Sequence, residues 1–457
     1  MEGQRSQVHA NNGTFAAVTE PFSGPAVVRQ LENCTYCPKM CRHACPVATT
    51  AGREPWTPQA KMDTLNQLRL GRNAWTQEGT ESLWACTACR HCTVYCEHDN
   101  EPGPVLFAGR AEAIAKGVGP ASLENYQERF AQRQERLRAR VQAEWSSEGE
   151  PGIATGFGGA VAKRRTTGRM SAVTPLGQPS DAQIPPERPP VAALASEIGY
   201  LPGCDTLDKN ATTVAAAMAV WKAMGQSVRL VTNATCGGYP LLAAGRPAAF
   251  RQHAAQVAVA LRGLKTVIVG CSACRFVMRG HYAAEGVSLP AEILSVPEFM
   301  ARHQARLPQP DREPALPDAP PGETGGRPVR TKKSVYYHDP CNLARAAGVT
   351  DEPRAVLRTL ANVREFAWNR TDTECCGGSG LLPKTDPATA DAMAKRRLAE
   401  IHARGGGTVV TACGTCSFML KRNAPASVDV VDLPTAVAQL GGVPFTEPAL
   451  PIDDDDD

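Results

Sequence analysis

The cysteines of this chain fall into closely spaced groups, and this spacing constrains the fold more than any other feature. The chain has 457 residues, seventeen of them cysteine. Nine cysteines lie between residues 204 and 416, and the other eight form two short blocks: Cys34, Cys37, Cys41 and Cys45, then Cys86, Cys89, Cys92 and Cys96. Thiolates gathered this closely are metal ligands more often than disulfide partners in intracellular proteins. The spacing therefore predicts a fold built around metal sites.

Charge and hydropathy exclude several classes of protein. Lys and Arg number 49 against 46 for Asp and Glu, so nothing favours nucleic acid as a partner. The first twenty residues lack the basic segment and apolar core of a secretory signal, and no run of eighteen apolar residues exists. We expect a cytoplasmic protein without a membrane span, with peripheral attachment at the inner face of the membrane, through a partner protein, left open.

Two similar units occupy the second half of the chain. In each, short β-branched runs alternate with helical patterns, and a cysteine follows most of the runs. The matched cysteines are Cys204 with Cys341, Cys236 with Cys376, Cys271 with Cys413, and Cys274 with Cys416. This internal duplication predicts two α/β units with parallel sheets. Their cysteines would meet outside the carboxyl ends of the strands, where open α/β sheets place their ligands.

Composition divides the rest of the chain. We expect a flexible arm over 1–30, a helical extension over 117–147 that is either a solvated helix or a docking strut, and an acidic tail over 444–457. Segments 148–190 and 306–333 are rich in glycine or proline and are predicted to be linkers. They separate three predicted domains: an all-α, ferredoxin-like two-cluster domain (31–116), a first α/β unit (191–305) and a second α/β unit (334–443).

The N-terminal block is expected to hold two [4Fe–4S] clusters. In two-cluster ferredoxins, three cysteines of one block bind one cluster and the fourth binds the other. That pattern assigns Cys34, Cys37, Cys41 and Cys96 to the first cluster, and Cys86, Cys89, Cys92 and Cys45 to the second. A pair of zinc sites is the alternative, although structural zinc sites usually need only two CxxC-like pairs.

The second unit has five cysteines: Cys341, Cys375, Cys376, Cys413 and Cys416. An adjacent pair of cysteines makes a strained disulfide, so Cys375 and Cys376 are better interpreted as metal ligands. The glycines that follow them permit a close approach of the backbone, whose N–H groups can bond sulfur.

The order Cys, Cys-Cys-Gly, Cys-x-x-Cys resembles the cysteine-rich CCG domain of heterodisulfide reductase. The same domain occurs in the iron–sulfur subunits of glycolate oxidase, of anaerobic glycerol-3-phosphate dehydrogenase and of lactate-utilisation oxidoreductases. The resemblance implies a noncubane [4Fe–4S] cluster, and hence the candidate redox site, at the five cysteines of the second unit. It also includes His338, either as a neighbour of that cluster or as a buried structural residue.

The first unit departs from this pattern, because Thr235 stands where the family has the first cysteine of CCG. Cys204, Cys236, Cys271 and Cys274 remain, a set that suits a cubane cluster, a zinc ion or a degenerate unit without metal. The loss argues against disulfide chemistry at a pair of noncubane sites.

Three functions follow as hypotheses. The resemblance favours an iron–sulfur subunit that passes electrons between a partner flavoprotein and a quinone or other acceptor. The chain has no flavin or nicotinamide fingerprint of its own, so any flavin would belong to the partner. The alternatives are a heterodisulfide-reductase-like enzyme that reduces a disulfide at the CCG cluster, and a zinc-binding structural module.

Overall fold

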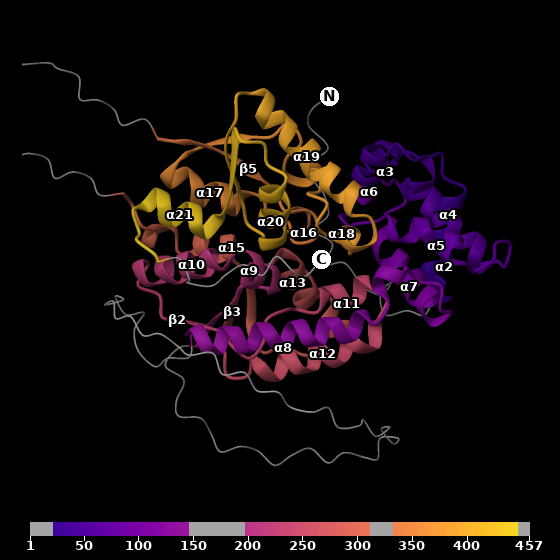
Figure 1. Cartoon of the computed structure of the whole chain (residues 1–457), viewed down its shortest axis with the longest axis horizontal. Helices are drawn as coiled ribbons and strands as arrows, with labels where there is room; N and C mark the ends of the chain where they lie inside the picture. The colour runs from indigo at the N-terminus through magenta and orange to yellow at the C-terminus, as the bar shows by residue number, and fades with distance from the viewer. Residues whose placement is uncertain (1–21, 146–196, 311–331, 447–457) are drawn as a thin grey trace, which may run out of the picture.

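The structure is a computed structural model that describes residues 22–145, 197–310 and 332–446. The predicted linker over 148–190 lies outside these ranges, as do most of the second linker and of the acidic tail. Figure 1 shows three parts: an N-terminal group of helices, and two α/β units coloured magenta and orange to yellow.

The N-terminal part is helical, and residues 22–145 contain no strand. Its helices are α2 (Pro25–Thr35), α3 (Pro46–Ala51), α4 (Pro58–Arg69), α5 (Gln77–Trp84), α6 (His91–Val94) and α7 (Pro102–Ala115). Proline occupies the first turn of α2, α3, α4 and α7, where its missing N–H costs no helical hydrogen bond. The predicted all-α region is confirmed, but the predicted arm over 1–30 is too long, because α2 begins at Pro25.

Helix α8 (Tyr126–Trp145) leaves this part and lies along the first α/β unit (Figure 1). Its buried residues Phe130, Leu137 and Val141 belong to the same hydrophobic core as that unit, while the rest of the helix is polar. Of the two interpretations of this polar helix, the structure supports the docking strut.

Both α/β units contain a four-stranded parallel sheet with the same strand order. The first sheet has the order β2-β1-β3-β4 and the second β6-β5-β7-β8. The strands are β1 (Ile198–Leu201), β2 (Val228–Leu230), β3 (Thr266–Val269), β4 (Glu292–Ser295), β5 (Ser334–His338), β6 (Asn362–Glu365), β7 (Gly407–Thr411) and β8 (Val428–Asp432). The predicted parallel sheets are confirmed by these pairings.

Helices connect the strands in each unit. The first has α9 (Cys204–Lys209), α10 (Ala211–Ala223), α11 (Tyr239–Ala243), α12 (Pro247–Ala260), α13 (Ser272–Phe276), α14 (Tyr282–Ala284) and α15 (Val296–Arg302). The second has α16 (Cys341–Ala344), α17 (Asp351–Leu360), α18 (Leu382–Thr385), α19 (Pro387–Ala403), α20 (Gly414–Arg422) and α21 (Leu433–Gly441). Asp386 caps the N-terminus of α19, because its carboxylate accepts from the Thr389 N–H at 3.1 Å.

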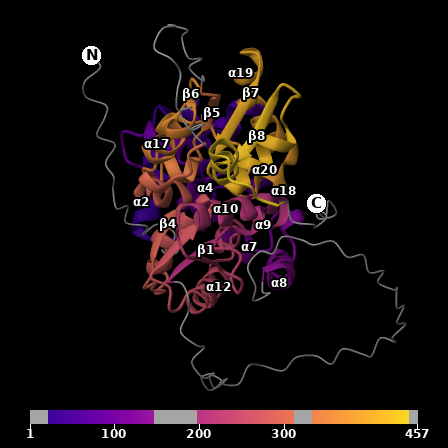
Figure 2. The same cartoon turned by 90° about the vertical axis from the view of Figure 1, so that its left-hand side faces the viewer.

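The two units pack directly on each other, as Figure 2 shows with the second unit above the first. Helix α10 contacts α21, α13 contacts α16, and α9 contacts α20. One hydrophobic core includes Trp221 and Phe299 of the first unit with Leu357 and Val437 of the second. The N-terminal helices dock mainly on the second unit through α3 and α19. No helix in the described ranges is long and apolar enough to cross a membrane.

Candidate iron–sulfur centres

The strand ends of both sheets carry cysteines at matching places. Cys271 follows β3 and Cys413 follows β7, while Cys204 and Cys341 begin the helices that come after β1 and β5. The turn before Cys204 requires glycine, because Gly203 has φ +95° and a Cβ there would meet the Cβ of Cys271 at 2.6 Å. The topology thus gathers cysteines that are far apart in sequence at one edge of each sheet.

The first predicted N-terminal set comes together around one cavity. Cys34, Cys37, Cys41 and Cys96 all line it. Asn100 contributes two hydrogen bonds to these sulfurs, from its side-chain amide to Cys34 at 3.1 Å and from its backbone N–H to Cys96 at 3.3 Å. Burial, together with neighbouring thiols, raises the pKa of Cys34 to about 11 and that of Cys41 to about 12.

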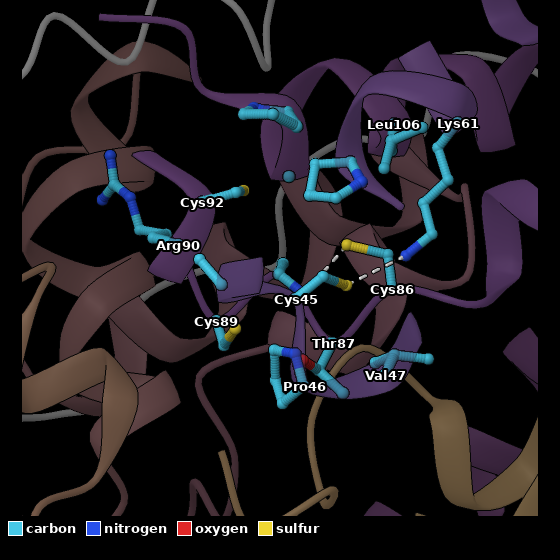
Figure 3. A pocket seen from close by; sticks show the side chains of 15 residues that line it. Cys45, Pro46, Val47, Lys61, Cys86, Thr87, Cys89, Arg90, Cys92 and Leu106 are labelled. Carbon is cyan, nitrogen blue, oxygen red and sulfur yellow. Dashed lines mark hydrogen bonds between the residues drawn. The ribbon is translucent and has the colours of Figure 1, made fainter. Parts of the chain in front are cut away.

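The second predicted set lines a neighbouring cavity (Figure 3): Cys45, Cys86, Cys89 and Cys92. Lys61, a buried lysine of α4, places its ammonium 3.7 Å from the Cys45 sulfur. The Ala88 N–H donates to Cys86 at 3.3 Å. Burial raises the pKa of Cys45 and of Cys92. The structure thus brings the four cysteines of each predicted set to one cavity, and Cys92 lines both cavities.

The donor set fits a metal cluster better than a single zinc ion. The seventeen cysteines are all free thiols, and most are buried. Buried thiols with raised pKa values need a cation to become thiolates, and metal supplies that charge. Zinc–sulfur bonds of about 2.3 Å would place four sulfurs about 4 Å apart. Among the described residues only His338, Cys376 and Cys416 have three donor atoms within 4.8 Å of one another, so the remaining sets are wider than a zinc site.

In the second unit all five cysteines are buried and form one group. The Cys376 and Cys416 sulfurs are 3.3 Å apart. Bonds from Cys375 and Cys416 hold the pKa of Cys376 well below its usual range, while interaction with Cys375 raises that of Cys341. Gly377 has φ +88°, and a Cβ there would lie 2.4 Å from the Ala390 carbonyl oxygen, so the CCG turn requires glycine. The backbone N–H of the next residue, Gly378, bonds the Cys376 sulfur.

Buried ionisable residues lie near this group. His338 is fully buried, and burial lowers its pKa to about 3. Asp339 forms an ion pair with the buried Arg354 through two bonds of 2.7 and 2.8 Å. Arg397 is also buried, and burial lowers its pKa to about 10, so it stays charged at neutral pH. Sequence reasoning missed these arginines and Lys61, because no local spacing marks them.

In the first unit the four remaining cysteines are also buried together. Cys236 interacts with Cys204 and Cys274, and Cys274 with Cys271. The N–H groups of Gly237 and Gly238 donate to Cys274 at 3.1 Å and to Cys236 at 3.3 Å. These backbone donors match the environment of a thiolate-bound cluster.

Helix α8 covers the position of the missing fifth cysteine. The Thr235 hydroxyl donates to the side-chain oxygen of Gln134 at 2.5 Å, and both residues are buried. Arg133, next on the same helix, bonds Asp205 at 3.0 Å and Asp208 at 2.7 Å and lies 3.9 Å from the Cys204 sulfur. The Thr235 hydroxyl thus bonds α8, whereas the second unit has Cys375 at the matching position.

Contacts between cysteines also connect one group with the next. Interaction with Cys375 raises the pKa of Cys89, which joins the second N-terminal set to the five-cysteine group. Cys413 interacts with Cys271 and accepts a hydrogen bond from Ser272 at 3.1 Å, which joins the two α/β units. Cys92 lines the cavities of both N-terminal sets, so neighbouring cysteines connect all four groups in the described part of the chain.

Comparison with known families agrees with this division. Residues 198–279 and 335–421 both match the cysteine-rich domain family CCG. Residues 30–100 match the 4Fe-4S dicluster domain family. The two α/β units are therefore copies of one domain type, and the helical block matches a 4Fe-4S dicluster domain.

Three relatives are each named as one subunit of a redox enzyme. The relative from the fumarate reductase (CoM/CoB) of Methanothermobacter marburgensis is 24% identical over 75% of this chain and 57% of its own length. The relative from the dihydromethanophenazine:CoB--CoM heterodisulfide reductase of Methanosarcina mazei is 23% identical over 86% of this chain and 88% of its own. The relative from the anaerobic glycerol-3-phosphate dehydrogenase of Escherichia coli is 25% identical over 50% of this chain and 56% of its own.

The first and third of these proteins are matched over little more than half of their length, whereas the heterodisulfide reductase protein is matched along most of it. The chain thus contains matches to a 4Fe-4S dicluster domain and to paired cysteine-rich CCG domains, and it is similar to subunits of heterodisulfide reductase and of anaerobic glycerol-3-phosphate dehydrogenase.

Proposed function

We propose that this chain is the iron–sulfur electron-transfer subunit of an oxidoreductase. In this proposal it passes electrons between a partner flavoprotein and a quinone or another acceptor. Its relatives are named as subunits of fumarate reductase, heterodisulfide reductase and glycerol-3-phosphate dehydrogenase, all of which are redox enzymes. When bound, iron–sulfur clusters supply one-electron redox chemistry.

The succession of cysteine groups carries this proposal. Cys92 lines the cavities of both N-terminal sets, Cys89 interacts with Cys375, and Cys413 interacts with Cys271. Clusters held by neighbouring ligands lie close together, and closeness is what electron transfer through a protein requires. We assign the order as first N-terminal set, second N-terminal set, five-cysteine site, then first-unit site.

The protein's own residues have defined tasks in this series. Cysteine sulfurs would hold the clusters, and backbone or amide N–H groups would bond those sulfurs. Lys61, Arg110 and Arg397 bring buried positive charge near the sites, which favours the negative charge of thiolate-bound clusters. Hydrogen bonds and burial are the means by which a protein adjusts the potential of such a centre.

Electron paramagnetic resonance on the anaerobically purified full chain tests the proposal. After complete reduction we expect signals of [4Fe–4S] clusters broadened by interaction between neighbouring spins. Cys96→Ser, which removes one ligand of the outermost set, is expected to simplify that spectrum, because one cluster loses its neighbour. A fully reduced protein with isolated, non-interacting signals would contradict the series.

A second function is favoured by the five-cysteine site itself. The relative from Methanosarcina mazei is named as part of a heterodisulfide reductase, so a disulfide is the acceptor to test at this site. Thr235 argues against a matched pair of such sites, because its hydroxyl is committed to Gln134. Turnover of a mixed disulfide with a reduced viologen as donor would favour this function. Absence of turnover would leave electron transfer as the only proposed function.

A further inference from the structure

A buried histidine lies against the five-cysteine site. His338 is the last residue of β5, and one of its ring nitrogens lies within 4.8 Å of the sulfurs of Cys376 and Cys416. Its Nε2 is buried and has no hydrogen-bond partner among the residues that the structure describes. A buried polar atom without a partner is costly, so this nitrogen needs an acceptor that belongs to the assembled site.

Arg397 determines which ring nitrogen of His338 carries the proton. Its Nε–H donates to Nδ1 of His338 at 3.2 Å. Arginine has donors and no acceptor, so Nδ1 must be the unprotonated nitrogen and Nε2 must carry the hydrogen. The guanidinium cannot easily turn away, because it also donates to the Trp368 carbonyl at 2.7 Å and lies 3.9 Å from the centre of the Phe366 ring.

The duplicated first unit provides an internal comparison. His338 lies three residues before Cys341, the first cysteine of the second unit. The matching residue of the first unit, three residues before Cys204, is the fully buried Leu201. Helices α19 and α12 hold matching places in the two units, and each begins with a proline. Ten residues after that proline, α19 has Arg397 and α12 has Val257. The histidine and the arginine are therefore absent together from the unit that also lacks the fifth cysteine. The two units share one fold, so the fold does not require this histidine and arginine, and they accompany the five-cysteine site.

We propose that the Nε2–H of His338, held in this tautomer by Arg397, donates a hydrogen bond to sulfur in the five-cysteine site and raises the reduction potential of the cluster bound there. A donor stabilises the extra negative charge of the reduced cluster more than it stabilises the oxidised form. The two α/β units would then differ in electron affinity. This inference rests on the proposed function, since it requires a cluster in the second unit.

The test is a redox titration of the full chain in which the electron paramagnetic resonance signal of each cluster is monitored. His338→Leu copies the first unit and removes the donor, whereas His338→Gln keeps an N–H near the position of Nε2. We expect a shift to lower potential for the second-unit cluster in His338→Leu and a return toward the native value in His338→Gln. The two N-terminal clusters should keep their potentials. His281→Leu, which removes a buried histidine of the first unit, is the matched control and should leave the second-unit cluster unshifted.

Iron and acid-labile sulfide are measured on every variant. His338→Leu with full iron and an unshifted potential would overturn the inference. So would loss of the second-unit cluster from both variants, because His338 would then be a ligand or a folding residue. Labelling with ¹⁵N-histidine adds a second criterion, since a donor gives only a weak coupling to nitrogen and a ligand a strong one. Absence of the cluster from the unmutated protein would instead refute the proposed function, and that result is seen before any variant is made.

Discussion

Buried arginines join parts of this molecule that are distant in sequence, and Arg110 does so most extensively. It is fully buried and donates to five backbone carbonyl groups. These belong to Leu83 (2.9 Å), Trp84 (3.4 Å), Cys86 (2.8 Å), Ala243 (2.9 Å) and Gly380 (2.9 Å). One side chain thus ties the N-terminal helices to both α/β units beside the second N-terminal set.

Arg110→Met is expected to destabilise the protein strongly. The substitution keeps the length of the side chain but leaves buried carbonyl groups without donors, at a cost of roughly 3–5 kcal/mol. The apparent melting temperature of the anaerobic protein measures the effect. Arg129→Met is the matched control, because Arg129 makes one exposed bond to the Ser122 carbonyl. Equal melting temperatures for the two variants would contradict this role of Arg110.

For single residues, the sequence predicts well which cysteines come together and predicts poorly which other side chains lie beside their sulfurs. The pattern of two-cluster ferredoxins predicts which four of the eight N-terminal cysteines line each cavity, because the fourth cysteine of each block serves the other cluster. Lys61 and Arg397 approach their sites from helices far away along the chain. Neither lies in a motif, and only the packing of α4 and α19 brings it to the sulfurs.

Among the elements, helix α8 has the most specific task. It supplies Arg133 to the acids of α9 and Gln134 to Thr235, so it covers the first-unit site. The polar sequence of this helix predicts a solvated surface or a strut and does not distinguish them. The distinction depends on three apolar residues, Phe130, Leu137 and Val141, which lie in the core of the first unit.

Arg133→Met is expected to loosen α8 from the first unit. The variant leaves Asp205 and Asp208 without their common partner and removes a cation beside Cys204. Amide hydrogen exchange should become faster along α8 and around the first-unit cysteines, with exchange in the second unit unchanged. Arg129→Met, on the first turn of the same helix, serves as the control. Native exchange rates along α8 in Arg133→Met would contradict the strut.

Over the whole molecule, duplication explains the fold and divergence explains the function. The repeated cysteines predict two parallel α/β units, and the common strand order confirms them. The contact of the units through α10 and α21 could not be predicted, because it depends on complementary buried surfaces and not on a pattern in either copy. Where the two units meet, Cys271 of the first-unit site interacts with Cys413 of the five-cysteine site.

The proposed series of electron-transfer sites requires that each of the four cysteine groups hold an iron–sulfur cluster. Iron, acid-labile sulfide and zinc per chain, measured on anaerobically purified protein, test it most directly. Four clusters of four irons predict about sixteen irons and about as many sulfides, without stoichiometric zinc. About twelve irons would remove the first unit from the series. Zinc with no labile sulfide would contradict the account and leave a structural metal protein.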